Sequence, residues 1–285
     1  MTDRITGAFN ERVSEKMELL SKMEKKAAGY MLENQGELIY ISITELADKV
    51  GTSEATISRV CTKLGYRGFQ ELKVSVAREL VTSQEKIHED LREDSSSEVI
   101  IDKIFSSAIQ TLEMTQKSLD SEAVSKGIEV LCKARKIVTI GNGNAGAMAM
   151  DAAHKFLRIG MDAVAYTDGH LQMIAVVSLT PEDVVVAFSH SGSSKDAIEA
   201  VRVAKERGVT VITVTKSGNS PITKYADIKL YTRSQETKYR TYAIASRMAE
   251  LTIIDTLYTG VSLRLNKKAI SNFEALENAL IVKKY

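Results

Sequence analysis

The feature that most constrains the fold is a set of five short apolar segments, rich in β-branched residues, between residues 137 and 231. Segments with helical apolar spacing separate most of them. Alternating strands and helices are typical of parallel strand pairing, with helices on both faces of the sheet. The sequence therefore predicts an α/β domain built on a five-stranded parallel sheet. Strands are expected at 137–140, 163–166, 184–187, 209–214 and 228–231, followed by a long helix over about 239–265.

The turn after the third predicted strand carries the clearest chemical signal. It contains Ser189, Ser191, Ser193 and Ser194 together with Gly192, and a helical pattern begins directly after it. Hydroxyls and backbone N–H groups then lie at a helix N-terminus, where the positive end of the dipole favours an anion such as phosphate. A single serine would be an ordinary helix cap. Four serines predict a phosphate site.

The turn after the first predicted strand has the sequence GNGNAG over residues 141–146. This is formally a dinucleotide fingerprint, and Asp168 lies near the end of the second strand at about the expected ~20-residue distance. A nicotinamide-dependent protein is therefore one alternative. Five strands instead of six, and a Ser-rich turn with no role in a nicotinamide site, favour a small phosphate pocket between the two turns. Both turns are expected at the carboxyl ends of their strands, where open α/β sheets bind ligands.

Residues 1–82 have helical patterns throughout, including apolar residues at helical spacing over 12–34. Ser42 and Glu45 have the spacing of a capping box, and the helix that they open is expected to end at Gly51. A second helix follows from Glu54. Such a pair is either a plain antiparallel helix pair or a helix-turn-helix, whose second helix enters the major groove of DNA. The side chains expected at the DNA are Ser53, Thr56, Ser58, Arg59 and Lys63.

Charge and cysteine content limit the possible functions. The net charge is +1 over 285 residues, so any DNA binding must be local. Residues 52–80 hold five Lys or Arg against three Glu, an excess on and after the proposed reading helix. Cys61 and Cys132 are far apart and lack metal-ligand spacing, which indicates a reducing compartment. With no signal-peptide pattern and no apolar run near ~20 residues, we expect a cytoplasmic protein without a membrane span or a metal.

Two segments, TSEATISR at 52–59 and KLGYRGFQELK at 63–73, resemble the N-terminal domain of RpiR-type bacterial transcription regulators. That family joins such a domain to a C-terminal sugar-isomerase-like (SIS) domain that binds phosphosugars, and the resemblance covers nearly the whole chain. It implies a helix-turn-helix domain at 1–82, a linker at 83–97, a SIS domain of flavodoxin-like fold at 98–265 and a tail at 266–285.

The resemblance also implies ligand-binding residues, because SIS domains have turns similar to Gly-x-Gly-x-Ser and Ser-x-Ser-Gly-x-Thr/Ser. Ala145 departs from this pattern, since a hydroxyl residue is often found there. The departure puts one sugar or phosphate contact in question and indicates a different ligand or weaker binding. His190 is either a ligand contact or a partly exposed loop residue. The implied phosphate-binding hydroxyls are Ser189, Ser191 and Ser194, and the first turn contributes Gly141, Gly143 and Asn144.

Four other residues have simpler interpretations. His154 is expected in the core or at an interface, and His170 at the start of a helix. Glu250 could face the pocket as a base, because isomerases of this fold use a carboxylate, but a surface or interface position is the commoner outcome. The segment 272–285 could pack on a partner subunit.

These patterns and the resemblance together predict a non-enzymatic transcription regulator without a cofactor. It binds operator DNA as a homodimer or homotetramer, and a phosphosugar effector bound in the SIS domain controls that binding. The alternative is a phosphosugar isomerase or lyase that carries a helical N-terminal extension.

Overall fold

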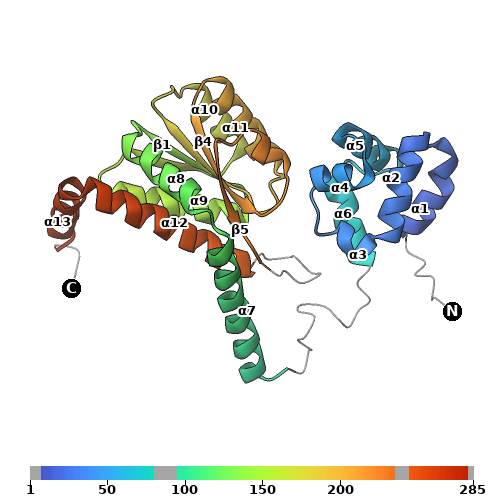
Figure 1. Ribbon diagram of the computed structural model, residues 1–285, viewed down its shortest axis with the longest axis horizontal. Helices are drawn as coiled ribbons and strands as arrows, with labels where there is room; N and C mark the ends of the chain where they lie inside the picture. The colour runs from blue at the N-terminus through green and yellow to red at the C-terminus, as the bar shows by residue number, and fades with distance from the viewer. Residues whose placement is uncertain (1–7, 80–94, 235–243, 282–285) are drawn as a thin grey trace. The chain divides into compact units, whose positions relative to one another are not determined.

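The computed structural model describes residues 8–79, 95–234 and 244–281, and the chain divides into two compact units (Figure 1). Most of the predicted linker lies outside the described residues, as do the first residues of the predicted helix at 239–265 and the last residues of the tail.

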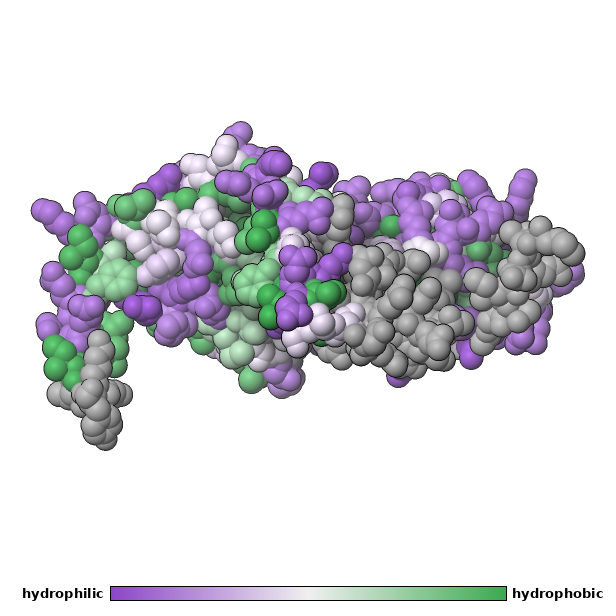
Figure 2. All heavy atoms as spheres, turned by 90° about the horizontal axis from the view of Figure 1, so that it is seen from below, coloured by the Kyte–Doolittle hydropathy of each residue, from purple (hydrophilic) through white to green (hydrophobic). Residues whose placement is uncertain are grey.

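The first unit is helical and has its own apolar core. Phe9, Met31, Leu46, Ile57 and Leu72 are fully buried in this core. On the face seen in Figure 2, the coloured atoms of this unit are mainly hydrophilic. Its elements are α1 (Ala8–Lys16), η1 (Met17–Leu19), α2 (Lys22–Glu33), α3 (Gln35–Leu38), α4 (Ile43–Val50), α5 (Glu54–Lys63) and α6 (Phe69–Glu79).

The helix pair predicted from the capping box is confirmed as α4 and α5. The Ser42 hydroxyl accepts from the Glu45 N–H, and the Glu45 carboxylate accepts from the Ser42 N–H. Gly51 ends α4 at φ +71°, in the left-handed region that favours glycine. Ser53 then caps α5, since its hydroxyl accepts from the Thr56 N–H.

The helical pattern over residues 12–34 is not one helix. The chain leaves the helix at Leu20 and starts again at Ser21, where Ser21 and Glu24 form a second capping box. As a result Leu19 and Met23 are exposed, by 71% and 40%, although their spacing fits an apolar stripe. The Ser-x-x-Glu spacing that revealed α4 is present here too, so the break could have been found from the sequence.

The second unit is a parallel α/β fold. Its single described sheet has the strand order β2-β1-β3-β4-β5, and every neighbouring pair is parallel. All five predicted strands are confirmed, with small extensions at the ends of β3, β4 and β5. The elements are α7 (Ser97–Ser118), α8 (Ser121–Lys133), β1 (Ile137–Ile140), α9 (Asn144–Arg158), β2 (Ala163–Tyr166), α10 (Gly169–Val177), β3 (Val184–Phe188), α11 (Lys195–Glu206), β4 (Thr210–Lys216), η2 (Pro221–Lys224), β5 (Ile228–Thr232), α12 (Ile244–Leu265) and α13 (Lys267–Ile281).

Helices cover both faces of this sheet, as the strand–helix alternation predicted (Figure 1). On one face α8, α9 and α12 pack through residues such as Leu131, Phe156 and Ile253. On the other face α10 and α11 pack through Val176 and Val201. Every residue of β3 is buried, as expected for the middle strand of a sheet covered on both sides.

Helix α7 carries large apolar side chains without cover in the described part of the chain. Ile101, Phe105 and Ile109 are 55% to 66% exposed, and their four-residue spacing places them along one side of the helix. None of the described helices is long and apolar enough to cross a membrane.

Candidate functional site: two turns at the carboxyl ends of β1 and β3

The sheet topology places the two predicted turns beside each other. Strands β1 and β3 are paired neighbours, although β2 lies between them in the sequence. In the order 2-1-3-4-5, the position between β1 and β3 is where successive connections turn to opposite sides, and ligands bind in the crevice there. The first turn follows β1 and the Ser-rich turn follows β3, so both lie at that edge of the sheet.

The first turn depends on glycine for steric reasons. A Cβ atom at Gly141 would lie 2.4 Å from the backbone oxygen of Ala145. Gly143, at φ +57° and ψ −125°, directly precedes α9 in a conformation that side-chain-bearing residues rarely adopt. These two glycines therefore allow the tight approach between the end of β1 and the first turn of α9.

In the Ser-rich turn, the helix cap is missing. Ser194 occupies the N-cap position of α11, but its side chain accepts no hydrogen bond from the helix. Its hydroxyl donates instead to Oδ1 of Asn142 in the first turn, at 3.4 Å. The first N–H groups of a helix have no partner inside the helix. The serines of this turn are therefore not explained as a simple cap, and the helix N-terminus keeps its capacity for an anion.

The remaining hydroxyls of the turn have different roles. Ser193 donates its hydroxyl to the backbone oxygen of Ser191 at 3.1 Å, so it stabilises the turn itself. The Ser191 hydroxyl oxygen accepts from the Ser193 N–H at 3.3 Å, which leaves its hydrogen available to another acceptor. Ser189 is 5% exposed, and its hydroxyl makes no hydrogen bond within the described residues. Two donors suited to an anion thus remain in the turn.

Sequence analysis did not single out two residues, Asn142, which links the two turns, and Gln172, which holds the first turn. Gln172 is fully buried on α10, and its Nε2 lies within hydrogen-bond distance of the backbone oxygens of Tyr166 and Gly141 and of Asn142 Oδ1. A lone amide in the apolar segment GHLQMIAVV was the available signal, because buried polar groups need partners.

His190 contacts a buried carboxylate. Its side chain is 16% exposed, and Nδ1 lies 3.9 Å from Oε1 of Glu250 on α12. Glu250 is only 2% exposed, so the surface position considered for it is wrong. The structure thus places a buried carboxylate of α12 next to His190 of the Ser-rich turn.

Of three other candidates, one caps a helix and two are exposed to solvent. Asp168, the ribose ligand of the dinucleotide alternative, caps α10 by accepting from the Leu171 N–H at 3.0 Å. His170 lies in the first turn of α10, as expected, and is exposed. His154 is exposed on α9 and not in the core.

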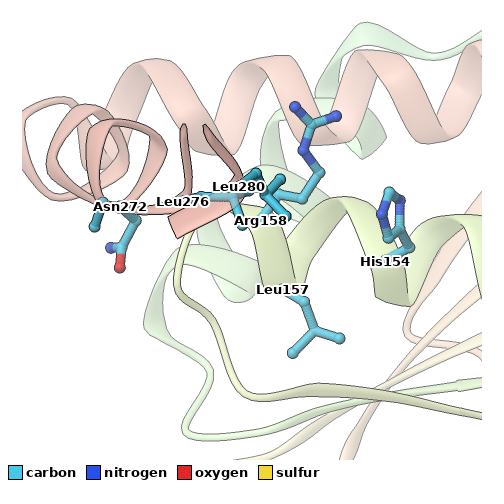
Figure 3. Close-up of a pocket in the computed structure, with 7 residues that line it drawn as sticks. His154, Leu157, Arg158, Asn272, Leu276 and Leu280 are labelled. Atoms are coloured by element: carbon cyan, nitrogen blue, oxygen red, sulfur yellow. The ribbon is translucent and has the colours of Figure 1, made fainter. Parts of the chain in front are cut away.

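His154 lies instead at a groove of about 800 Å³ between α9 and α13 (Figure 3). Leu157 and Arg158 line one side from α9, while Leu276 and Leu280 line the other side from α13. Leu276 and Leu280 thus line a groove of their own chain, and Leu280 is still 38% exposed. The packing of this segment on a partner subunit stays a prediction. None of the predicted ligand-binding residues lines this groove.

In the helical unit, the predicted DNA-contacting residues differ in availability. Ser53, Ser58 and Arg59 are exposed on α5. Thr56 is only 7% exposed, and its hydroxyl bonds the hydroxyl of Ser53 at 3.0 Å and accepts from Arg59 Nη2 at 3.2 Å. Thr56 therefore holds the start of the helix and the Arg59 side chain in place.

Lys63 forms an ion pair inside the unit. Its Nζ lies 2.8 Å from a carboxylate oxygen of Glu24, whose side chain is only 6% exposed. The hydrogen bond from Lys63 and the one from the Ser21 N–H lower the pKa of Glu24 from its ordinary 4.5 to about 2. Lys63 thus stabilises the contact between α5 and α2.

Other cations behind the predicted positive excess are also engaged. Lys73 is buried and donates to the backbone oxygen of Ile41 at 2.7 Å. Arg67 pairs with Glu71 at 3.2 Å. The positive charge that α5 itself presents to a partner is therefore mainly that of Arg59.

A helical unit with a capped helix-turn-helix, joined to a parallel α/β unit with an uncapped Ser-rich turn, is the organisation of a ligand-responsive DNA-binding regulator. Comparison with known proteins agrees. The family profile "SIS domain" matches residues 130–260, and the profile "Helix-turn-helix domain, rpiR family" matches residues 8–83. The chain belongs to the RpiR family of HTH-type transcriptional regulators, which confirms the resemblance inferred from the sequence.

Individual relatives match over almost their full lengths. An uncharacterized HTH-type transcriptional regulator of Caldanaerobacter subterraneus is 38% identical, covering 92% of this chain and 93% of the relative. The HTH-type transcriptional regulator HexR of Escherichia coli is 33% identical, covering 95% and 93%. The structure of Vibrio vulnificus NanR complexed with ManNAc-6P is 26% identical, with a TM-score of 0.84, covering 98% of this chain and 100% of that one. The curated relatives are named regulators, in agreement with the expectation of a non-enzyme.

Proposed function

We propose that the SIS domain binds a phosphorylated sugar and that this ligand controls the binding of α5 to operator DNA. The observation that carries the proposal is the N-terminus of α11, which has no side-chain cap and lies beside the hydroxyls of Ser189 and Ser191. A dianionic phosphate accepts several charge-assisted hydrogen bonds at such a position. The proposed ligand contacts are Gly141, Gly143, Asn144, Ser189, His190, Ser191 and Ser194.

Two further points support a phosphosugar over a bare anion. The two turns lie next to each other, so a ligand larger than phosphate can touch both. In addition, the related NanR structure contains ManNAc-6P, a phosphorylated sugar. The effector acts on DNA binding only if it binds one arrangement of the protein better than another, and such coupling is usually ~1–3 kcal/mol.

For the DNA contact we propose the exposed side of α5. Arg59 is its main cation, and a guanidinium can donate two hydrogen bonds to guanine in the major groove. Ser53 and Ser58 are placed to contact phosphates or bases. Thr56 and Lys63 act mainly by fixing the helix, because both are engaged within the unit.

We also propose a homodimer or homotetramer that works in the cytoplasm, where operator DNA is found. Helix-turn-helix proteins commonly bind two half-sites as dimers. The exposed apolar side of α7, with Ile101, Phe105 and Ile109, supports self-association, because large apolar groups of this kind are often interaction surfaces. Light scattering on the wild type and on Phe105→Glu tests this, and dissociation of the variant is expected.

The central experiment measures effector binding. Thermal shift is recorded with glucose 6-phosphate, fructose 6-phosphate, N-acetylmannosamine 6-phosphate and arabinose 5-phosphate, each beside its unphosphorylated sugar. A ligand of the native state raises the melting temperature, and we expect this only for a phosphorylated compound. Calorimetry then compares the wild type with the triple variant Ser189→Ala, Ser191→Ala and Ser194→Ala.

Charge-assisted hydrogen bonds contribute ~1.5–3 kcal/mol each, so the triple variant should lose at least two decades of affinity at ~1.4 kcal/mol per decade. Its melting temperature without ligand should stay near that of the wild type, since none of the three hydroxyls belongs to the apolar core. A folded triple variant that binds the effector as tightly as the wild type would place the phosphate elsewhere.

A further inference from the structure

The amide of Gln172 has an orientation that its neighbours determine. Its side chain is fully buried on α10, and one end of the amide lies 3.0 Å from the backbone oxygen of Tyr166 and 3.4 Å from that of Gly141. Carbonyl oxygens only accept hydrogen bonds. The end of the amide that faces them must therefore be the NH₂ group, because the reverse orientation would oppose oxygen to oxygen.

This orientation determines that of Asn142 in the first turn. The same NH₂ group of Gln172 lies 3.3 Å from the side chain of Asn142, which must therefore present its oxygen, Oδ1, to it. The hydroxyl of Ser194 donates to the same oxygen at 3.4 Å. With Oδ1 held from two sides, the NH₂ group of Asn142 is turned the other way. Within the described residues it has no acceptor, and it is not enclosed by protein.

The position of this NH₂ group matters for what it can reach. Asn142 follows β1, whereas the phosphate turn follows β3, and paired strands lie ~4.8 Å apart. The Asn142 amide is therefore about one strand spacing from the proposed phosphate position. It contacts Ser194, on the side of the Ser-rich turn that faces the first turn. In a phosphosugar, the hydroxyl and carbonyl oxygens of the sugar lie at about that distance from the phosphorus atom.

We propose that Asn142 is a specificity-determining residue, whose Nδ2 donates a hydrogen bond to a hydroxyl or carbonyl oxygen of the sugar part of the effector. This inference rests on the proposed function. The donor is preorganised, because Gln172 fixes the amide before the ligand arrives and little side-chain entropy is lost on binding. The Ser-rich turn recognises the phosphate, and Asn142 distinguishes a phosphosugar from phosphate alone.

The test compares two probes on the full chain, inorganic phosphate and whichever of the four phosphosugars above binds most tightly. Asn142→Asp keeps the oxygen that Gln172 and Ser194 contact and replaces the NH₂ donor by an acceptor. The added negative charge weakens both probes, since both carry phosphate, so the ratio of their dissociation constants isolates the sugar contact. We expect the preference for the phosphosugar over inorganic phosphate to fall about tenfold.

Ser191→Ala is the matched control, because it removes a proposed phosphate contact from the same crevice. It should weaken both probes by a similar factor and leave the ratio near the wild-type value. Asn142→Ala, which adds no charge, is the second variant and should lower the ratio as Asn142→Asp does.

The outcomes are distinguishable. An unchanged ratio in folded Asn142→Asp and Asn142→Ala overturns the role of Asn142 while the phosphate site stands. A wild type that binds inorganic phosphate but prefers no phosphosugar also overturns it, since there is then no sugar contact to assign. A wild type that binds neither probe refutes the proposed function itself.

Discussion

The proposed reading helix α5 and the proposed effector site present their polar groups by different means. On α5 the candidate groups are side chains of a regular helix, and several also hold the unit together: Thr56 fixes the helix start and Lys63 neutralises Glu24. At the proposed effector site the backbone sets the geometry, because Gly141 and Gly143 in the first turn and Gly192 in the Ser-rich turn allow the path of the chain, and the N-terminus of α11 supplies donors.

This difference determines how each site should respond to mutation. A helix surface tolerates the loss of one side chain without moving the others, so effects on DNA binding should be graded. A turn built by close backbone approach has no such tolerance, so one added methyl group can remove the whole site. The predictions below use this contrast, in order of decreasing expected effect.

Gly141→Ala should have the largest effect. The new Cβ would meet a backbone oxygen at 2.4 Å, and no side-chain movement can relieve that contact. Overpacking of this kind costs ~1–3 kcal/mol of stability, and we expect detectable effector binding by calorimetry to disappear because the turn is displaced. Gly68→Ala is the matched control, since its Cβ would meet nothing within 4 Å. Wild-type effector affinity in Gly141→Ala would contradict the idea of a backbone-built site.

Arg59→Ala should weaken binding to the specific operator by ~10- to 100-fold, corresponding to ~1–3 kcal/mol for a guanidinium that reads a base edge. Fluorescence anisotropy with specific and unrelated DNA measures both affinities. Arg59→Lys keeps the charge but lacks the planar fork, so it should retain most non-specific binding and lose specificity. If the alanine variant binds the operator like the wild type, α5 does not read DNA through this residue.

The fold and the two turns could be predicted because their signals are local. β-Branched runs revealed the strands, a Ser-x-x-Glu spacing revealed α4, and glycines and serines clustered within six residues marked each turn. The strand order did not follow from the residues, because parallel sheets allow more than one order, and the flavodoxin-like fold was implied only by the family resemblance. The observed order brings the ends of β1 and β3 together.

Apart from the helix break at Ser21, which has a local signal, the missed features depend on pairs that are distant in the sequence. Lys63 forms an ion pair with Glu24, 39 residues away in the sequence, and Gln172 donates a hydrogen bond to Asn142, 30 residues away. Such pairs are selected by how helices pack, and the residue types alone are compatible with many other partners. The burial of Glu250 beside His190 is of the same kind, because an isolated Glu in a helix gives no sign of which side faces the core.

The Glu24–Lys63 pair makes a prediction about stability. Glu24→Gln should lower the free energy of unfolding of the helical unit by ~1–2 kcal/mol at pH 7, since a charge-assisted bond to a mostly buried group is lost. The folded pKa of about 2 lies below the ordinary 4.5. The wild-type advantage is therefore complete above pH 4.5 and is lost as the pH falls towards 2. Urea unfolding followed by circular dichroism at pH 7 and pH 2.5 should show the difference between the two proteins shrink. A difference independent of pH would mean that the carboxylate charge is not its source.

The smallest expected effect is on catalysis, where we expect none. Glu250 is buried 3.9 Å from His190, beside the proposed effector crevice, so a carboxylate and an imidazole are available to an isomerase or lyase reaction. The presence of an acid and a base is not sufficient for general acid–base catalysis, because each group must also reach the proton that it transfers in a bound substrate. Glu250 lies against His190, so the carboxylate can hold the imidazole in place for its proposed ligand contact without transferring a proton. NMR of each binding phosphosugar, incubated with the wild type for hours, should therefore show no aldose–ketose interconversion and no cleavage. Turnover by the wild type that Glu250→Gln abolishes, while effector binding persists, would show that the two turns form an active site. The comparison would then be between a helix that reads DNA and a site that catalyses a reaction.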